Sequence, residues 1–214
     1  MKRSAFAAAA ALLLASATLF GCSEKTDGLT PVTLNEVAHS IFYAPQYAAI
    51  ELGYFEEEGI NLTLVNGGGA DKVMTSLISG DADIGFMGSE SSIYVYQQGS
   101  EDYAVNFAQL TQRAGNFLVA RTPDDSFTWD KLKGKTVLGG RAGGMPEMIF
   151  EFILRKNGID PKTDLTIDQS IDFGLTAAAF TGNDADYTVE FEPHATSLEL
   201  EGEGYVVASL GVDS

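Results

Sequence analysis

The stretch with the clearest binding chemistry is a run of glycines between a predicted strand and a predicted helix. The apolar, β-prone segment 61–65 predicts the strand, and Gly67–Gly69 follow it closely. Glycines carry no side chain that would hold a ligand away from the backbone, and they adopt positive φ angles readily. The backbone N–H groups of Gly68, Gly69 and Ala70 lie where the predicted helix begins. Donors at a helix N-terminus suit an acceptor or anionic group of a small ligand. The alternative is an ordinary tight turn.

A second glycine-rich loop, residues 140–145, repeats this arrangement after the predicted strand 135–139. Arg141 in this loop suits a carboxylate, sulfonate or phosphate group, because a guanidinium binds such anions through two hydrogen bonds. An arginine on the outer surface is an equal alternative. We expect Arg141, Gly143 and Met145 to face the first glycine loop across a cleft.

Aromatic and polar residues share the loop after the first predicted strand, and together they suit a small planar or apolar solute. These candidates are His39, Ser40, Phe42 and Tyr43. For His39 the alternative is a hydrogen-bonded histidine with a packing role.

Acidic residues near the predicted loops bear on the charge of the solute. Ser89 and Glu90 follow one short predicted strand, and Glu192 follows another. Capping or first-turn positions of helices are the alternatives for all three. If Glu90, Glu147 and Glu192 line the cleft, an amine-bearing or neutral heterocycle is favoured, and if they point outward an oxyanion fits as well. We favour the heterocycle.

A predicted helix follows the first glycine loop and positions it. Apolar residues recur at i, i+3, i+4, i+7 and i+8 from Ala70 to Ile78, which predicts a helix with one apolar face. Asp71 lies in the first turn, where the helix dipole favours a negative charge, and Gly80 is placed to end the helix. Pro146 similarly opens a helix after the second glycine loop.

Strands and helices alternate along the chain, which predicts an α/β fold with mainly parallel sheets. We expect strands at 32–37, 61–65, 84–87, 104–110, 116–121, 135–139, 164–168 and 187–191, and helices that begin near residues 45, 70, 91, 146 and 175. Two landmarks recur in order. Gly59–Asn61 matches Gly158–Asp160 after 99 positions. Asp81–Asp83 matches Asp184–Asp186 after 103 positions. Because each pair of landmarks brackets a strand, a loop and a helix in the same order, we expect two similar α/β lobes.

The lobes are expected at residues 32–118 and 119–204, with 205–214 returning toward the first lobe. The segments 116–119 and 205–211 are the expected crossings between them. Parallel sheets bind ligands outside the carboxyl ends of their strands. Both sets of loops should therefore face one cleft, which closes by a hinge.

The charge balance and the N-terminus indicate an exported protein. The chain holds 13 Lys and Arg residues against 30 Asp and Glu residues, and no basic patch suggests nucleic acid as a partner. Residues 1–22 combine a positive start with an apolar run, as a signal peptide does. They end at Leu19–Cys22, which resembles the lipobox of bacterial lipoproteins and implies a membrane anchor through lipidated Cys22. A plain secretory signal is the alternative. Residues 23–31 are expected to form a tether.

Several motifs, in order, resemble bacterial ABC-transporter substrate-binding proteins, in the group that handles nitrate, sulfonates, taurine and thiamine-pyrimidine precursors. They are Glu36–Ser40, Tyr43–Tyr47 and Leu52–Ile60, continued by Asn66–Ala70, Gly80–Phe86, Leu132–Lys135, Gly140–Glu147 and Phe191–Pro193. The resemblance implies a two-lobed periplasmic-binding-protein fold of type 2, with no catalysis, and delivery of a captured small-molecule solute to a membrane permease. Members of the group continue past the point where this chain stops, which implies a truncated chain with an incomplete first lobe. We also expect a monomer without a cofactor or metal.

An enzyme is the competing class. A related fungal family makes the thiamine pyrimidine on the same fold, with a cysteine-rich motif and iron. This chain has one cysteine, Cys22, and two histidines, His39 and His194. No catalytic motif stands out, so we expect binding without turnover. A lipid-anchored interaction module is a third alternative, and it predicts no closed cleft.

Overall fold

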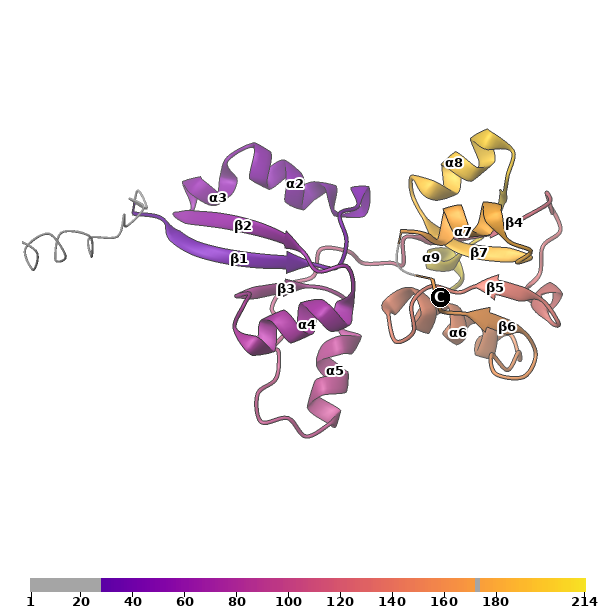
Figure 1. Ribbon diagram of the computed structural model, residues 1–214, viewed down its shortest axis with the longest axis horizontal. Coiled ribbons are helices and arrows are strands. Elements are labelled where there is room, and N and C mark those ends of the chain that lie inside the picture. Colours follow the sequence, from indigo (N-terminus) through magenta and orange to yellow (C-terminus); the bar gives the residue numbers. More distant parts are fainter. Residues whose placement is uncertain (1–27, 172–173) are drawn as a thin grey trace, which may run out of the picture.

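The computed structural model describes residues 28–171 and 174–214. The expected signal peptide, Cys22 and most of the tether lie outside these residues. The described chain forms two α/β lobes, joined by the segment between α5 (Glu90–Gln97) and β4 (Asn116–Ala120) (Figure 1). Within the described ranges, no helix has both the length and the apolar character that crossing a membrane requires.

A three-stranded parallel sheet forms the first lobe, in the order β2–β1–β3. Leu34 of the central strand pairs with Leu64 on one side and with Ile84 on the other. Helix α3 packs on β2, whereas α4 packs on β3 and β1 (Figure 1). The elements are β1 (Thr30–Glu36), η2 (Ile41–Tyr43), α2 (Ala44–Glu51), α3 (Tyr54–Glu57), β2 (Ile60–Asn66), α4 (Ala70–Ser79) and β3 (Ile84–Phe86).

Helix α4 buries the middle of the apolar face that its sequence predicts, whereas Ile78 at the end of that face is 39% exposed. Val73 is completely buried and Met74 is 4% exposed, so this face is turned into the lobe. Gly80 ends the helix with a φ of +81°, a left-handed conformation that favours glycine. The N-terminus of α4 therefore begins at the glycine loop, as expected.

Five strands form the sheet of the second lobe, in the order β6–β5–β7–β4–β8. Strand β5 runs parallel to β6 and β7, and β4 runs antiparallel to β7 and β8. The remaining elements are η3 (Trp129–Leu132), β5 (Thr136–Leu138), α6 (Met145–Lys156), β6 (Thr166–Asp168), α7 (Thr176–Gly182), β7 (Tyr187–Phe191), α8 (His194–Glu201), β8 (Tyr205–Ser209) and α9 (Leu210–Asp213).

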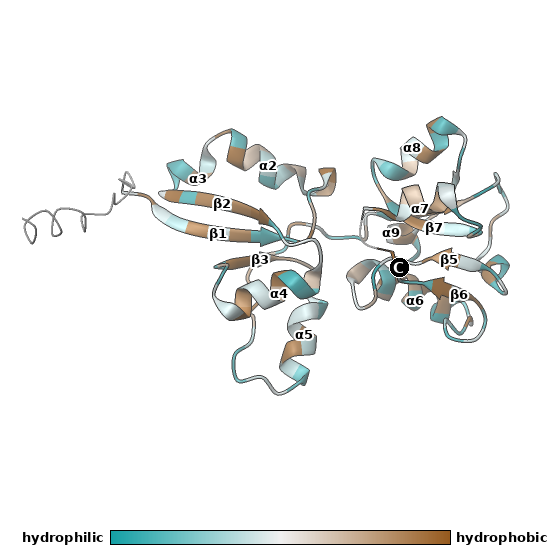
Figure 2. Cartoon of the chain, in the orientation of Figure 1, coloured by the Kyte–Doolittle hydropathy of each residue, from teal (hydrophilic) through white to brown (hydrophobic). Residues whose placement is uncertain are grey.

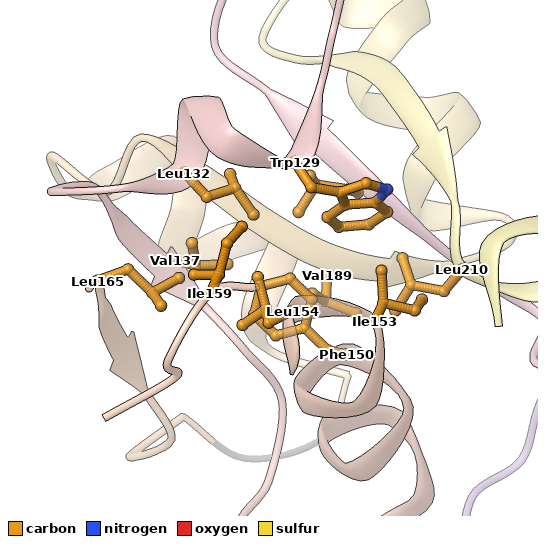
Figure 3. Close-up of a cluster of buried hydrophobic side chains, with 11 residues drawn as sticks. Trp129, Leu132, Val137, Phe150, Ile153, Leu154, Ile159, Leu165, Val189 and Leu210 are labelled. Carbon is orange, nitrogen blue, oxygen red and sulfur yellow. The ribbon is translucent and has the colours of Figure 1, made fainter. Parts of the chain in front are cut away.

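The larger hydrophobic core lies in the second lobe, under helix α6. Phe150, Ile153 and Leu154 of this helix are completely buried and pack against residues of η3, β5 and β7 (Figure 3). Trp129 is 9% exposed and belongs to this cluster. Strands and helices alike mix hydrophobic and hydrophilic residues along their length (Figure 2).

The expected strand at 104–110 is wrong. These residues form no regular element, and Val105 and Phe107 are more than 70% exposed, at 75% and 77%. β-prone residues form a strand only when a neighbouring strand offers them hydrogen bonds and a surface to pack on. Propensity alone was therefore a poor guide for this segment.

Sheet pairing also corrects the expected division of the chain. Residues 116–118 were assigned to the first lobe, but they belong to β4, which pairs with β7 in the second sheet. The segment 205–214 was expected to return toward the first lobe, but β8 pairs with β4 in the second lobe. The end of the tether is corrected too, because β1 already begins at Thr30. Backbone pairing between distant segments, which local sequence does not reveal, decides all three.

Candidate functional site

A cavity of about 440 Å³ lies between the two lobes, and we call it the interlobe cavity. Its wall includes the segments that follow β1, β2, β5 and β7, which is the edge where α/β sheets bind ligands. The lining residues are Val37, Ala38, His39, Ser40, Ile41, Asn66, Gly68, Gly140, Pro146, Gly174, Thr176, Val189, Glu190, Phe191, Glu192, Pro193 and His194.

Glu36, at the end of β1, organises the wall of the first lobe. Its side chain is 1% exposed and accepts hydrogen bonds from Gln46 Nε2 at 2.9 Å and from the Tyr47 hydroxyl at 2.8 Å. His39 Nδ1 lies 3.0 Å from its other carboxylate oxygen. The imidazole also packs on the ring of Tyr47, with ring centroids 4.3 Å apart. A buried carboxylate thus holds a histidine at the cavity wall.

Glu190 occupies a similar place in the second lobe, near the end of β7. Its side chain is buried, and its oxygens accept hydrogen bonds from the hydroxyls of Thr188 at 2.6 Å and Thr176 at 3.0 Å. Burial raises the pKa of Glu190, and the two hydroxyl hydrogen bonds and nearby His194 offset this only in part. The second lobe therefore places a buried glutamate in the cavity lining, whereas in the first lobe Glu36 lies behind the lining residue His39.

Glu192 lines the interlobe cavity, but its carboxylate also accepts hydrogen bonds from the first turn of helix α8. It accepts hydrogen bonds from the N–H of Thr196 at 3.1 Å and from the Thr196 hydroxyl at 2.9 Å, in the first turn of α8. The structure therefore shows the helix-terminus role that the sequence left open, at a residue that also faces the cavity.

The two glycine-rich loops face each other across the lobes, as expected, and Arg141 joins them. Its Nη2 lies 2.8 Å from Asp71 Oδ2, and its Nη1 donates to the carbonyl oxygen of Gly68 at 3.4 Å. The sequence suggested an anionic ligand as the partner of Arg141. In the structure a carboxylate of the opposite lobe takes that place.

Arg141 and Asp71 also line a second space of about 370 Å³, formed by α4, α5 and the second glycine loop, which we call the outer cavity. The other lining residues are mostly apolar or small: Ala70, Met74, Thr75, Ile78, Ser91, Tyr94, Val95, Ala142, Gly143 and Gly144. The predicted site residues are thus divided. His39, Ser40, Gly68 and Glu192 line the interlobe cavity, whereas Ala70, Arg141 and Gly143 line the outer cavity.

The backbone of the first glycine loop is partly used by the chain itself. The N–H of Gly68 donates to Asn66 Oδ1 at 3.0 Å, so it is not the open donor that the sequence suggested. Gly68 has a φ of +69°, a conformation that side-chain-bearing residues rarely adopt. A side chain at Gly69 would meet Asp71 and Arg141 at 2.7 and 3.0 Å. The loop therefore needs glycine for its shape and for the contact between the lobes.

Phe42 and Tyr43 pack at the seam between the lobes rather than lining either cavity. The Tyr43 ring lies 4.4 Å from that of Phe86, and the Phe42 ring lies 5.7 Å from that of Phe191 in the second lobe. Burial raises the pKa of Tyr43 to about 12, and neighbouring charges contribute to the shift. Phe42 thus contacts the second lobe, and Tyr43 packs on a strand of the first.

Glu90, in the first turn of α5, is buried at the same seam. It is 2% exposed, and neither carboxylate oxygen has a hydrogen-bond partner among the described residues. Burial raises the pKa of Glu90, and the backbone N–H groups of Glu90 and Met145, which lie nearby but outside hydrogen-bonding geometry, offset this only in part. Ser89 takes the N-cap position without a side-chain capping bond. Because Met145 begins α6, the carboxylate lies close to the opposite lobe.

Sequence reasoning did not select Glu36, Glu190 or His194 as site residues. Each glutamate is a charged residue at or near the end of a strand that mixes apolar and polar residues, and this position was the available signal. Within the described residues, no group of three or more His, Cys, Asp or Glu side chains is arranged to hold a metal ion.

Comparison with known proteins agrees with this architecture. The sequence model of the family described as "NMT1/THI5 like" matches residues 41–210. A relative from Bacillus subtilis (strain 168), named "Putative binding protein YtlA", is 50% identical over 196 residues, which is 92% of this chain and 58% of the relative. The chain thus spans less than two thirds of the length of that relative.

Two solved structures show the same fold at low sequence identity. The alkanesulfonate-binding protein SsuA from Xanthomonas axonopodis pv. citri, bound to MOPS, aligns with a TM-score of 0.65 and 17% identity over 83% of this chain and 60% of its own. The periplasmic nitrate-binding protein NrtA from Synechocystis PCC 6803 aligns with a TM-score of 0.61 and 16% identity over 83% and 51%. The expected two-lobed periplasmic-binding-protein fold is confirmed. Since the family match covers most of the sequence, this chain belongs to the NMT1/THI5-like family.

Proposed function

We propose that this chain is the solute-binding component of an ABC importer. It works outside the cytoplasm, anchored to the membrane through lipidated Cys22, and it delivers a captured small organic solute to a permease. The observation that carries the proposal is the interlobe cavity, whose wall comes from both lobes. Its volume of about 440 Å³ falls in the range of small-molecule sites. Membership of the family and the name of the Bacillus subtilis relative support the proposal.

The charges around the interlobe cavity favour an amine-bearing or neutral heterocycle, such as a thiamine-pyrimidine precursor. No Lys or Arg is among its lining residues, all of which lie in the described part of the chain, whereas Glu190 and Glu192 are. Arg141 is paired with Asp71 at the outer cavity instead. An anion such as nitrate or a simple sulfonate would meet the carboxyl groups of Glu190 and Glu192 and no lysine or arginine among the lining residues. Taurine, which carries an ammonium group, is the intermediate alternative.

A thermal-shift screen tests the proposal with four probes: hydroxymethylpyrimidine, taurine, ethanesulfonate and nitrate. A ligand that binds only the folded chain, at a concentration of about 100 times its Kd, stabilises the fold by about 2.7 kcal/mol. Each 1 kcal/mol raises the Tm of a chain of this size by roughly 2–4 °C. We expect a rise with hydroxymethylpyrimidine and none with nitrate. A higher Tm with nitrate alone contradicts the proposed solute class. An unchanged Tm with all four probes contradicts the proposal that the chain binds a solute of these classes.

Product analysis separates binding from catalysis. After prolonged incubation with excess chain, hydroxymethylpyrimidine should be recovered unchanged, because the proposed role is capture and release. Conversion of the pyrimidine into another compound would favour the enzyme alternative.

The lipid anchor has its own test. Replacing Cys22 with serine removes the thiol that would carry the lipid, so the variant should lose metabolic labelling with a fatty-acid probe and leave the membrane fraction. Continued lipid labelling of the Cys22→Ser variant would contradict this part of the proposal.

A further inference from the structure

We propose that Glu36 fixes the tautomer of His39, so that His39 Nε2 presents a hydrogen-bond acceptor to an N–H or O–H group of the solute. The inference rests on the proposed function, because it names the chemistry by which the interlobe cavity recognises its solute. In this account His39 binds the solute, and Glu36 is a positioning residue that acts through His39.

The tautomer follows from the partner of Nδ1. His39 Nδ1 lies 3.0 Å from Glu36 Oε1, and a carboxylate offers only acceptor oxygens. The proton of a neutral imidazole must therefore sit on Nδ1, where it is donated to Glu36. Nε2 is then left with a lone pair. The same relation between carboxylate and histidine sets the tautomer of histidines in metal sites.

The position of the ring is fixed as firmly as its tautomer. Tyr47 packs against the imidazole, and its hydroxyl donates to Glu36 Oε2 and accepts from the N–H of Ser40. Gln46 donates to the same carboxylate from the buried side. These contacts hold Glu36, which is 1% exposed, while the side chain of His39 is 68% exposed at the wall of the interlobe cavity. The ring thus has a held edge and an open edge.

The open edge selects for a donor on the solute. An aminopyrimidine offers N–H and O–H groups, and taurine offers an ammonium group. Nitrate and simple sulfonates offer no donor at neutral pH, and their oxygens would face the lone pair of Nε2. His39 therefore favours solutes with hydrogen-bond donors over simple anions, as the acidic residues that line the cavity also do.

His194 provides a matched comparison within the chain. It lines the same cavity from the second lobe, close to a buried glutamate, Glu190. The oxygens of Glu190, however, accept hydrogen bonds from the hydroxyls of Thr188 and Thr176. A general effect of losing one imidazole from the cavity should appear in both histidine variants, whereas the proposed role belongs to His39 alone.

The first measurement needs no variant and no solute. Long-range nitrogen–proton NMR correlations of the histidine side chains, recorded on the purified chain at about pH 8, report which ring nitrogen carries the proton of a neutral imidazole. We expect His39 protonated at Nδ1. Replacing Glu36 with glutamine, which can also donate, should give a mixture of tautomers. A His39 protonated mainly at Nε2 in the unaltered chain overturns the positioning role of Glu36.

The second measurement is calorimetric titration with hydroxymethylpyrimidine. Loss of one hydrogen bond to the solute should weaken binding by about tenfold in His39→Ala. His39→Gln should recover part of the loss, because its amide oxygen can accept near the position of Nε2. His39→Asn, which is shorter, should not. His194→Ala, which removes a cavity-lining imidazole that has no contact with Glu36, should lose less affinity than His39→Ala.

The outcomes distinguish a failure of the His39 contact from a failure of solute binding by the chain. Equal affinities for His39→Ala and the unaltered chain overturn the inference while leaving the proposed function standing. Equal losses in His39→Ala and His194→Ala also overturn it, since the effect would then belong to the cavity in general. If the unaltered chain binds no probe, the proposed function fails together with the solute contact of His39. The tautomer then still decides whether Glu36 positions the ring.

Discussion

The guanidinium of Arg141 lies 2.8 Å from the carboxylate of Asp71, and this ion pair joins the two lobes. Asp71 stands in the first turn of α4, and Arg141 stands in the glycine loop before α6. Because Arg141 Nη1 also reaches the carbonyl of Gly68, the contact connects both glycine-rich loops. The two residues come from different lobes and both line the outer cavity, so the ion pair links the lobes there.

Replacing Asp71 with alanine should loosen the lobes without unfolding them. The Asp71 side chain is 61% exposed and that of Arg141 is 30% exposed, so solvent screens the pair and its loss should cost less than about 1 kcal/mol of stability. Small-angle scattering should show a larger radius of gyration for the variant. The matched control is Asp124→Ala, which removes an ion pair with Lys131 inside the second lobe. An unchanged radius in Asp71→Ala would show that the pair does not hold the lobes together.

A side chain at Gly68 should abolish solute binding while the fold persists. The Gly68→Val variant has free space, since an added Cβ would meet only Lys72 Nζ at 3.8 Å. Its φ of +69° would nevertheless strain the residue by about 1–2 kcal/mol and distort the cavity wall. Gly59→Val is the control, with a φ of +77° and open space, outside the residues that line the cavities. Both variants should lose similar stability by urea denaturation, and only Gly68→Val should lose affinity. Retained affinity in Gly68→Val would refute the role of the loop.

Replacing Glu90 with glutamine should stabilise the chain and flatten its pH dependence. Burial raises the pKa of Glu90 above its ordinary value of 4.5, so the folded chain holds this proton more tightly than the unfolded chain. The free energy of unfolding should therefore fall as the pH rises from 4.5 through the raised pKa, and the loss should persist at neutral pH. Glu90→Gln removes this loss.

Urea denaturation at several pH values checks this prediction. Glu51→Gln, at an exposed position on α2, controls for the removal of one negative charge. If Glu90→Gln is less stable than the unaltered chain at neutral pH, the carboxylate has a stabilising partner and the argument from burial is wrong.

Two phenylalanines of α6 should differ widely in their effect on stability. Phe150 is completely buried in the core of the second lobe, so Phe150→Ala should cost about 3–5 kcal/mol. Phe152 lies on the same helix but is 51% exposed, and Phe152→Ala should change stability by roughly 0.5 kcal/mol or less. Similar losses for both variants, measured by thermal or urea unfolding, would contradict the assigned core.

Local pattern was sufficient for much of the fold. The periodicity from Ala70 to Ile78 predicted α4 and its apolar face, and the glycine-rich stretches marked the two loops that Arg141 brings together. These features depend on residues close in sequence. Strand pairing depends on residues far apart in sequence, which is why residues 116–118 of β4 and all of β8 were assigned to the wrong lobe.

The site was harder to predict than the fold because side-chain partners are set by tertiary structure. Asp71 was identified as a first-turn acid, but its ion pair with Arg141 joins positions 70 residues apart. Glu36 appeared only as the start of a family motif, although it accepts three contacts at the cavity wall. A glutamate at the end of a strand, such as Glu36, therefore indicates a candidate site residue.

Calorimetric titration of two tryptophan variants tests the central claim, that the solute lies in the interlobe cavity. Ile41 lines the interlobe cavity and is 65% exposed, while Ile78 lines the outer cavity and is 39% exposed. Ile41→Trp should therefore fill the solute site at little cost to folding, and Ile78→Trp should crowd only the outer cavity. We predict saturable binding of hydroxymethylpyrimidine that is lost in Ile41→Trp and retained in Ile78→Trp. Binding that survives in Ile41→Trp and disappears in Ile78→Trp would place the solute in the outer cavity and contradict the account.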